Sequence, residues 1–234
     1  MIERSRREER CLRAVSGVLD KVRHSRNASE TANALFARFL SAAGMLESGP
    51  ELLSREGLND KEAQLLSLIP PLARYSMRTQ YGAHPRLASL NAAAGYLQAV
   101  YIGVPIEQFF VLCLDASGYL IRCPLLQKGT VDETPFYLPH LLKVAIETHA
   151  SAVILAHNHP GGTRRPSLAD VECTKEALSA LLALRIPMLD HLIAAGGEIV
   201  SLRETGWIDR SEWMRQDVTG ALNRLWLAAE REKA

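Results

Sequence analysis

The 234-residue sequence lacks paired cysteines, long apolar runs and a large net charge. Its four cysteines stand apart without a Cys-x-x-Cys pair, which argues against a disulfide framework or a thiolate zinc knuckle and favours a reducing cytoplasm. We expect neither a membrane span, which needs roughly 18 apolar residues, nor a secretory signal, because no apolar segment follows the charged N-terminus. A formal net charge of +1 gives no general attraction to nucleic acid, so any DNA role must come from a local site.

The rest of the composition, 47% hydrophobic and 23% charged, is that of an ordinary globular protein. Apolar residues at helical spacing predict a small helical domain over residues 1–82, and the Gly- and Pro-containing segment Thr79–Pro85 is typical of a linker. Residues 83–206 alternate strand-like and helical patterns, which predicts an α/β domain with a mixed sheet. Residues 207–234 predict an added amphipathic helix, whose tryptophans offer a contact surface for a homo-oligomer.

Within the α/β region we expect strands at 109–114, 119–124, 152–156, 189–194 and 198–202, with helices at 87–100, 139–149 and 168–184. His157 and His159 directly follow the buried strand 152–156. In extended backbone these two side chains project to the same side, at the strand end where ligands of α/β sheets bind. Asp170 is the nearest third candidate, and zinc in hydrolytic sites takes three His or carboxylate ligands and keeps one position for water.

These residues also have simpler interpretations. Ser167-x-x-Asp170 is the pattern of a capping box that starts the helix at Leu168, and taken alone this structural role is favoured. A single His-x-His is more often a polar strand exit than a metal site. Both patterns together would bring four polar side chains to one point, and this convergence favours a Zn²⁺ site. A zinc deaminase would require His-x-Glu and Pro-Cys-x-x-Cys, and the sequence contains neither.

Several motifs follow one another in a fixed order: Glu107-x-Phe109, Val111–Asp115, Lys128–Thr130, Ile154–Pro160, Pro166-Ser167-x-x-Asp170, Leu189–Ile193 and Val200–Glu204. In this order, residues from about 87 to 204 resemble the RadC family, whose domain belongs to the JAMM/MPN-plus metalloproteases. Two stretches depart from the family pattern. Leu138–Leu141 stands where the family usually has His-Pro-Arg-Glu, and Pro160–Arg165 replaces Pro-Ser-Gly-Asp. Both departures would alter substrate contacts or side chains around the metal ligands, and they leave the ligands themselves intact.

The resemblance implies a mixed-sheet JAB/MPN (cytidine-deaminase-like) α/β domain preceded by a small helical domain. It implies that His157, His159 and Asp170 bind zinc, that Glu107 is the general base and that Ser167 donates to the oxyanion. Such a site hydrolyses peptide or isopeptide bonds of a protein or peptide substrate. A hydroxyl and a helix N-terminus aimed at developing negative charge suit that last role. Read without the resemblance, Glu107 would be a solvated residue at a strand entrance.

The helical residues 1–82 resemble, in degenerate form, the helix-hairpin-helix region that precedes the RadC domain. In such a hairpin a Gly-x-Gly turn brings backbone N–H groups against a DNA phosphate. Gly57-Leu58-Asn59 stands here instead. Three other hypotheses therefore stay open. The protein is a DNA repair or recombination accessory protein, with or without hydrolase activity, or its helical part is a docking or dimerisation module, or the whole is an inactive scaffold.

Overall fold

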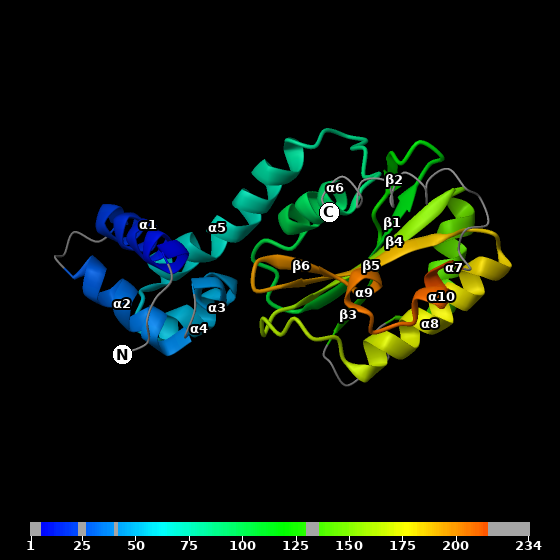
Figure 1. The fold of residues 1–234 in the computed structure, drawn as a ribbon. Helices are drawn as coiled ribbons and strands as arrows, with labels where there is room; N and C mark the ends of the chain where they lie inside the picture. Colours follow the sequence, from blue (N-terminus) through cyan, green and yellow to red (C-terminus); the bar gives the residue numbers. More distant parts are fainter. Residues whose placement is uncertain (1–5, 23–26, 40–41, 130–135, 215–234) are drawn as a thin grey trace. The chain divides into compact units, whose positions relative to one another are not determined.

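The computed structural model describes residues 6–22, 27–39, 42–129 and 136–214 (Figure 1). The chain divides into two compact units, Met1–Tyr75 and Ser76–Ala234. This division falls inside helix α5, Asp60–Thr79, rather than in the segment Thr79–Pro85 that we expected to be the linker. Among the described residues, no helix combines the length and the apolarity that crossing a lipid bilayer would require.

The first unit consists of helices α1 (Arg6–Val22), α2 (Ala28–Phe39), α3 (Ala42–Glu47), α4 (Pro50–Arg55) and most of α5. Its core is apolar and includes Leu19, Leu35 and Leu66. Asn59 caps α5, because its side chain accepts the Glu62 N–H at 3.0 Å while the Glu62 carboxylate accepts the Asn59 N–H.

Gly57 ends helix α4 in the left-handed region, at φ +101°. Its N–H donates to Ser54 O at 3.2 Å, and the Leu58 N–H donates to Leu53 O at 3.3 Å. These bonds satisfy the last carbonyls of the helix in the manner of a Schellman cap. The glycine of this turn therefore has a local structural role that needs no phosphate.

The second unit is built on one mixed sheet. Its elements are α6 (Leu90–Val100), β1 (Glu107–Leu114), β2 (Leu120–Arg122), β3 (Leu125–Gly129), α7 (Leu138–Glu147), β4 (Ala152–His159), α8 (Leu168–Ala183), β5 (Met188–Ala195), β6 (Glu198–Ser201), α9 (Leu202–Thr205) and α10 (Arg210–Met214). The strand order is β2-β1-β4-β5-β6, and β3 pairs with β1. Strands β4 and β5 are parallel and the other pairs are antiparallel. The predicted α/β class with a mixed sheet and a preceding helical region is confirmed.

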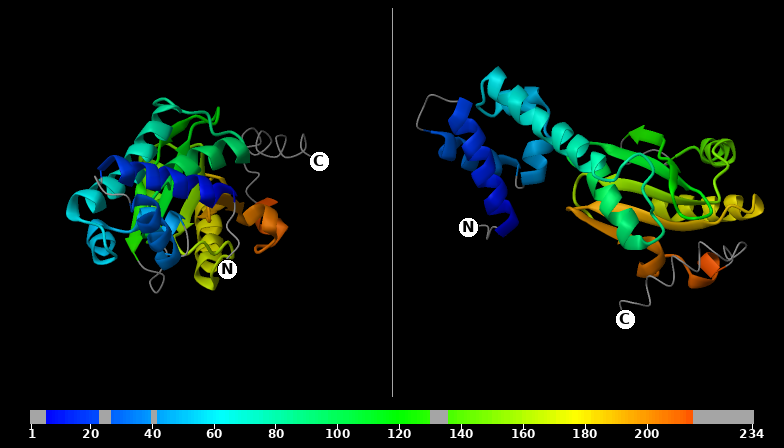
Figure 2. Two further views of the ribbon diagram at one scale, coloured as in Figure 1. Left: turned by 90° about the vertical axis from the view of Figure 1, so that its left-hand side faces the viewer. Right: turned by 90° about the horizontal axis from the view of Figure 1, so that it is seen from above.

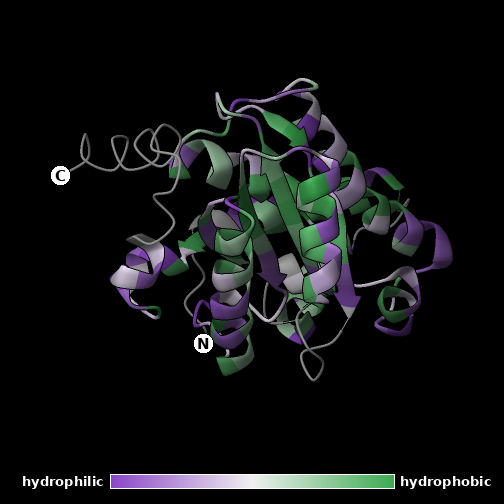
Figure 3. Ribbon diagram, turned by 90° about the vertical axis from the view of Figure 1, so that its right-hand side faces the viewer, coloured by the Kyte–Doolittle hydropathy of each residue, from purple (hydrophilic) through white to green (hydrophobic). Residues whose placement is uncertain are grey.

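Helices cover both faces of this sheet (Figure 2). On β4, Val153 and Leu155 pack with α7 and α8, whereas Ile154 and Ala156 pack against α6. The strands are accordingly hydrophobic along most of their length (Figure 3). This alternation continues to the end of β4, so that His157 and His159 lie on the α7–α8 side and Asn158 lies on the α6 side.

Two predicted elements differ from the structure. The strand expected at 119–124 is shorter, and a further strand, β3, follows Pro124 and also pairs with β1. The proline interrupts the pattern, and the polar Gln127 and Lys128 hide the apolar alternation of β3. Of the predicted helical tail 207–234, the structure describes α10, and Leu222, Leu225 and Trp226 lie outside the described residues.

Candidate metal centre

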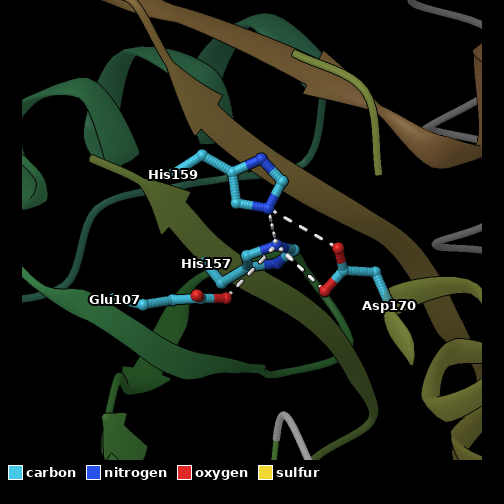
Figure 4. Close-up of side chains that lie close together, drawn as sticks. All are labelled: Glu107, His157, His159 and Asp170. Atoms are coloured by element: carbon cyan, nitrogen blue, oxygen red, sulfur yellow. Dashed lines mark hydrogen bonds and ion pairs between the residues drawn. The ribbon is translucent and has the colours of Figure 1, made fainter. Parts of the chain in front are cut away.

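Four side chains with potential metal-ligating atoms meet at the carboxyl end of β4: Glu107, His157, His159 and Asp170 (Figure 4). One such atom from each lies within 4.8 Å of all the others. The two histidines belong to the last residues of β4, Glu107 begins β1, and Asp170 lies in the first turn of α8. These are the four residues that the sequence singled out as three ligands and a base, and the fold brings them together.

The Nε2 atom of His157 is the centre of this group. It lies 2.9 Å from His159 Nε2, 3.2 Å from Asp170 Oδ1 and 3.9 Å from Glu107 Oε1. The side chain of His157 is fully buried, whereas that of Glu107 is 17% exposed. Glu107 is therefore the member most distant from His157 Nε2, and solvent reaches it about as easily as His159, which is 15% exposed.

The outer nitrogen of His159 is held by the loop that follows β4. Its Nδ1 lies 2.6 Å from Thr163 O. A carbonyl only accepts hydrogen bonds, so this nitrogen carries the ring hydrogen and Nε2 keeps its lone pair. That lone pair faces His157 and Asp170, which is the orientation that a metal ligand requires.

The electrostatics of the site favour an ionised Asp170. Burial acts to raise the pKa of this carboxyl, but the close approach of His157, His159 and Ser167 outweighs burial and holds the pKa well below its usual range. Glu107 behaves differently, because burial raises its pKa more than His157 and His159 lower it. The two carboxyl groups are thus distinguished by their surroundings, as in many acid–base sites.

Ser167 forms the predicted capping box at the start of α8. Its hydroxyl accepts the Asp170 N–H at 3.0 Å, and its own N–H and hydroxyl each donate to Asp170 Oδ2 at 2.7 Å. The capping role and the proximity to the ligand group therefore coexist. In this arrangement the hydroxyl hydrogen that an oxyanion would need is directed at the Asp170 carboxylate.

Asn158 is a buried residue at the site, and the sequence alone did not reveal its role. Its side-chain oxygen accepts the Gln108 N–H at 2.9 Å, and its amide nitrogen donates to Ile106 O at 3.1 Å. These two bonds bracket Glu107 on both sides. The signal in the sequence was its position between the two histidines, on the opposite face of the strand.

Behind His157, two further buried side chains continue the polar cluster. His157 Nδ1 lies 2.8 Å from His191 Nε2, and His191 Nδ1 lies 2.6 Å from Thr174 Oγ1. Burial and the neighbouring His157 lower the pKa of His191 well below its ordinary value. From the sequence alone, the place of His191 after Asp190 in a predicted strand favours a structural or supporting role. Thr174 was missed, although it stands four residues after Asp170 and so on the same face of the helix.

The donor set fits a metal ion that prefers nitrogen and carboxylate oxygen. Two imidazole nitrogens and one ionised carboxylate at the end of a buried strand are ligands typical of a divalent transition metal. These polar atoms lie close together in a largely buried place. A bound cation would offset the repulsion between them. The group could therefore bind a metal ion.

Residues 87–207 match the family model of the RadC-like JAB domain, and this span contains all four side chains. The chain is also 34% identical over 181 residues to a UPF0758 protein of Bordetella bronchiseptica, covering 77% of this chain and 80% of that protein. It is 35% identical over 173 residues to a UPF0758 protein of Herminiimonas arsenicoxydans, covering 74% of this chain and 77% of that protein. The chain therefore belongs to the RadC family and carries its JAB-type domain.

Proposed function

We propose that this protein is a zinc-dependent hydrolase of peptide or isopeptide bonds, with His157, His159 and Asp170 as zinc ligands and Glu107 as general base. The observation that carries the proposal is the convergence of these four side chains within 4.8 Å of one another. Three of them suffice as protein ligands of a hydrolytic zinc, and the fourth is a carboxyl group on the solvent side.

Zinc in such a site polarises a carbonyl and lowers the pKa of a water molecule. The chain's own contribution begins with ligand orientation. The Thr163 carbonyl directs the lone pair of His159 Nε2 inward, and Ser167 together with the helix N-terminus keeps Asp170 ionised. Phe109 stacks on the His157 ring at a centroid distance of 4.8 Å and limits its rotation.

Glu107 is suited to proton transfer rather than ligation. Its Oε1 is the most distant from His157 Nε2, at 3.9 Å, and burial raises its pKa toward the range in which a carboxylate accepts and returns a proton. In the proposed reaction the Glu107 carboxylate removes a proton from the attacking water as the new carbon–oxygen bond forms. It then delivers this proton to the leaving amine nitrogen as the carbon–nitrogen bond breaks.

Zinc content provides the first test. We expect about one zinc per chain by elemental analysis of the purified full-length protein, and loss of that zinc in Asp170→Ala. Glu147→Ala is the matched control, because this glutamate lies exposed at the end of α7. Wild-type protein that binds no zinc, even after incubation with zinc chloride, would refute the proposal.

Glu107→Gln provides the second test. This variant should keep its zinc and lose at least about 100-fold in the rate of cleavage, because it loses the general base. The assay is mass-spectrometric detection of new amino termini in a proteome-derived peptide library, with a parallel library of lysine-linked isopeptides. Glu198→Gln, an exposed carboxylate on β6 that pairs with Arg164, is the control. Equal cleavage by wild type and Glu107→Gln would contradict the role of this base.

The DNA-binding alternative would depend on the helical unit and not on the metal group. There, Gly57 closes the end of α4, so its positive φ is explained without a bound phosphate. A titration with duplex DNA at two salt concentrations would support this alternative if binding appeared at low salt and weakened at high salt.

A further inference from the structure

We propose that Thr174 and His191 are positioning residues that fix the ring tautomer of His157 through a directional chain of hydrogen bonds, and thereby set the affinity of the site for zinc. This inference rests on the proposed zinc site. It concerns two side chains that need not touch the metal or the substrate. They act through His157, which is the central member of the ligand group.

The chain of hydrogen bonds begins at a backbone carbonyl. The Thr174 hydroxyl contacts Asp170 O, four residues earlier in α8, and also His191 Nδ1. The carbonyl can only accept, so the single hydroxyl hydrogen of Thr174 is donated to it. The contact with His191 must then use a lone pair of the hydroxyl oxygen. His191 Nδ1 therefore carries the ring hydrogen.

The direction of this bond determines the next one. His191 is fully buried, and a neutral imidazole has one ring hydrogen, which is already placed on Nδ1. Its Nε2 therefore has a lone pair, and the 2.8 Å contact with His157 Nδ1 requires that His157 be the donor. The hydrogen of His157 thus lies on Nδ1. Its Nε2 keeps the lone pair that faces His159 and Asp170.

Both ends of the chain belong to proposed ligand residues. It starts at the main chain of Asp170 and ends at the ligand nitrogen of His157. Histidines that bind metals usually donate their second ring N–H to a carboxylate, a carbonyl or water. Here a second imidazole accepts that hydrogen, and an imidazole can bind in either tautomer. The Thr174 hydroxyl removes this ambiguity, because it accepts from His191 only when its own hydrogen is on Asp170 O.

Without the hydroxyl, His191 would leave a buried N–H without an acceptor if it kept its tautomer. The other tautomer would place a hydrogen on His191 Nε2, pointing at His157 Nδ1. His157 would then accept that bond and carry its own hydrogen on Nε2, which is the atom that should bind zinc. Loss of Thr174 Oγ1 should therefore weaken zinc binding, although the hydroxyl lies two side chains behind the ligand atom.

Thr174→Val tests this, since it removes the hydroxyl and keeps the shape of the side chain. We expect the zinc affinity, measured by competition with a chromogenic chelator, to fall by roughly 10- to 100-fold. Thr174→Ser restores the hydroxyl and should bind within about threefold of wild type. Thr148→Val is the matched control: this buried threonine makes the same bond to the carbonyl four residues earlier, Val144 O, at 2.8 Å in α7. Thr174→Val with wild-type affinity would overturn the inference.

The tautomers themselves can be observed by long-range ¹H–¹⁵N NMR correlation of the imidazole rings. In metal-free wild type, Nδ1 of both His157 and His191 should carry a hydrogen, and this pattern should change in Thr174→Val. An Nε2–H tautomer of His191 in wild type would refute the chain of hydrogen bonds. This measurement needs only wild-type protein, so it decides the question even if Thr174→Val fails to fold. If wild type shows the expected tautomers but binds no zinc, the proposed function fails and the positioning chain stands.

Discussion

Replacing Asn158 with alanine should loosen the segment that carries Glu107 while leaving the proposed zinc ligands in place. The backbone ladder between β1 and β4 ends at the pair Phe109–His157. Beyond this pair, the Asn158 side chain takes over, with bonds to the Gln108 N–H at 2.9 Å and to Ile106 O at 3.1 Å. Asn158 is 4% exposed, so these bonds replace contacts that water could not easily supply.

The size of the effect follows from the groups left behind. A buried donor or acceptor that loses its partner costs about 1–3 kcal/mol, and the variant removes the partner of two partly buried groups, the Gln108 N–H and the Ile106 carbonyl. Ile106 is 36% exposed, so water can compensate part of the loss on that side. Two such losses would add up to about 2–6 kcal/mol. We expect the lower half of this range, so the free energy of unfolding should fall by about 2–4 kcal/mol.

Urea denaturation measures this change, with Gln98→Ala as control because Gln98 is exposed and makes one long bond of 3.4 Å. Hydrogen exchange of the Gln108 amide should accelerate in the Asn158 variant. Zinc content should stay near that of wild type, since His157, His159 and Asp170 are held by β5 and α8, whereas peptide cleavage should fall. An unfolding change below about 0.5 kcal/mol together with unchanged Gln108 exchange would refute this reasoning.

Three further predictions concern pH and helix capping. Burial acts to lower the pKa of His159, but Asp170 and other neighbours raise it overall, so protons should compete with zinc for this ring already above pH 6.5. Chelator competition between pH 6 and 8 should show that the zinc affinity falls toward acid pH. A flat profile would contradict this prediction. Burial raises the pKa of Asp190 from 3.8 to about 7 against three hydrogen bonds. Its protonated form therefore stabilises the fold fully below about pH 4, and this contribution, up to about 4 kcal/mol, is lost as pH rises to about 7. Urea unfolding should show this slope in wild type and not in Asp190→Asn. Ser167→Ala should lower the free energy of unfolding by about 1 kcal/mol, because it loses the α8 cap. Thermal unfolding measures this change, and Ser167→Thr should unfold close to wild type.

The residues that we propose as ligands could be predicted from the sequence because their placement follows from local rules. His157 and His159 continue the alternation of a buried strand, and Ser-x-x-Asp marks the start of the next helix. Strand end and helix start are joined by a short loop, so these three side chains must lie close together. Glu107 is different. It enters the site from β1, a separate antiparallel strand, and was found through the family resemblance rather than through spacing.

The contacts of the supporting residues could not be predicted, since they depend on pairings between distant segments. Asn158 acts on the chain before β1 only because the β1–β4 ladder ends one pair earlier. Thr174 and His191 meet because α8 packs over β5, which the sequence does not specify at the level of single atoms. Strand β3 was missed for a related reason: its pairing with β1 compensates for a weak apolar pattern.

The cost of this buried polar cluster argues against a scaffold that has merely kept its fold. Asp170 and His157 are 2% and 0% exposed, and Thr174 and His191 extend the polar atoms further inward. Burying an ionised carboxylate costs several kcal/mol, and apolar residues of similar volume often give equal or greater stability. A scaffold would gain from such replacements. The contacts of His157 with His191 and of His159 with the Thr163 carbonyl instead suit lone pairs that face one point, and that arrangement is useful to a protein that binds a cation there.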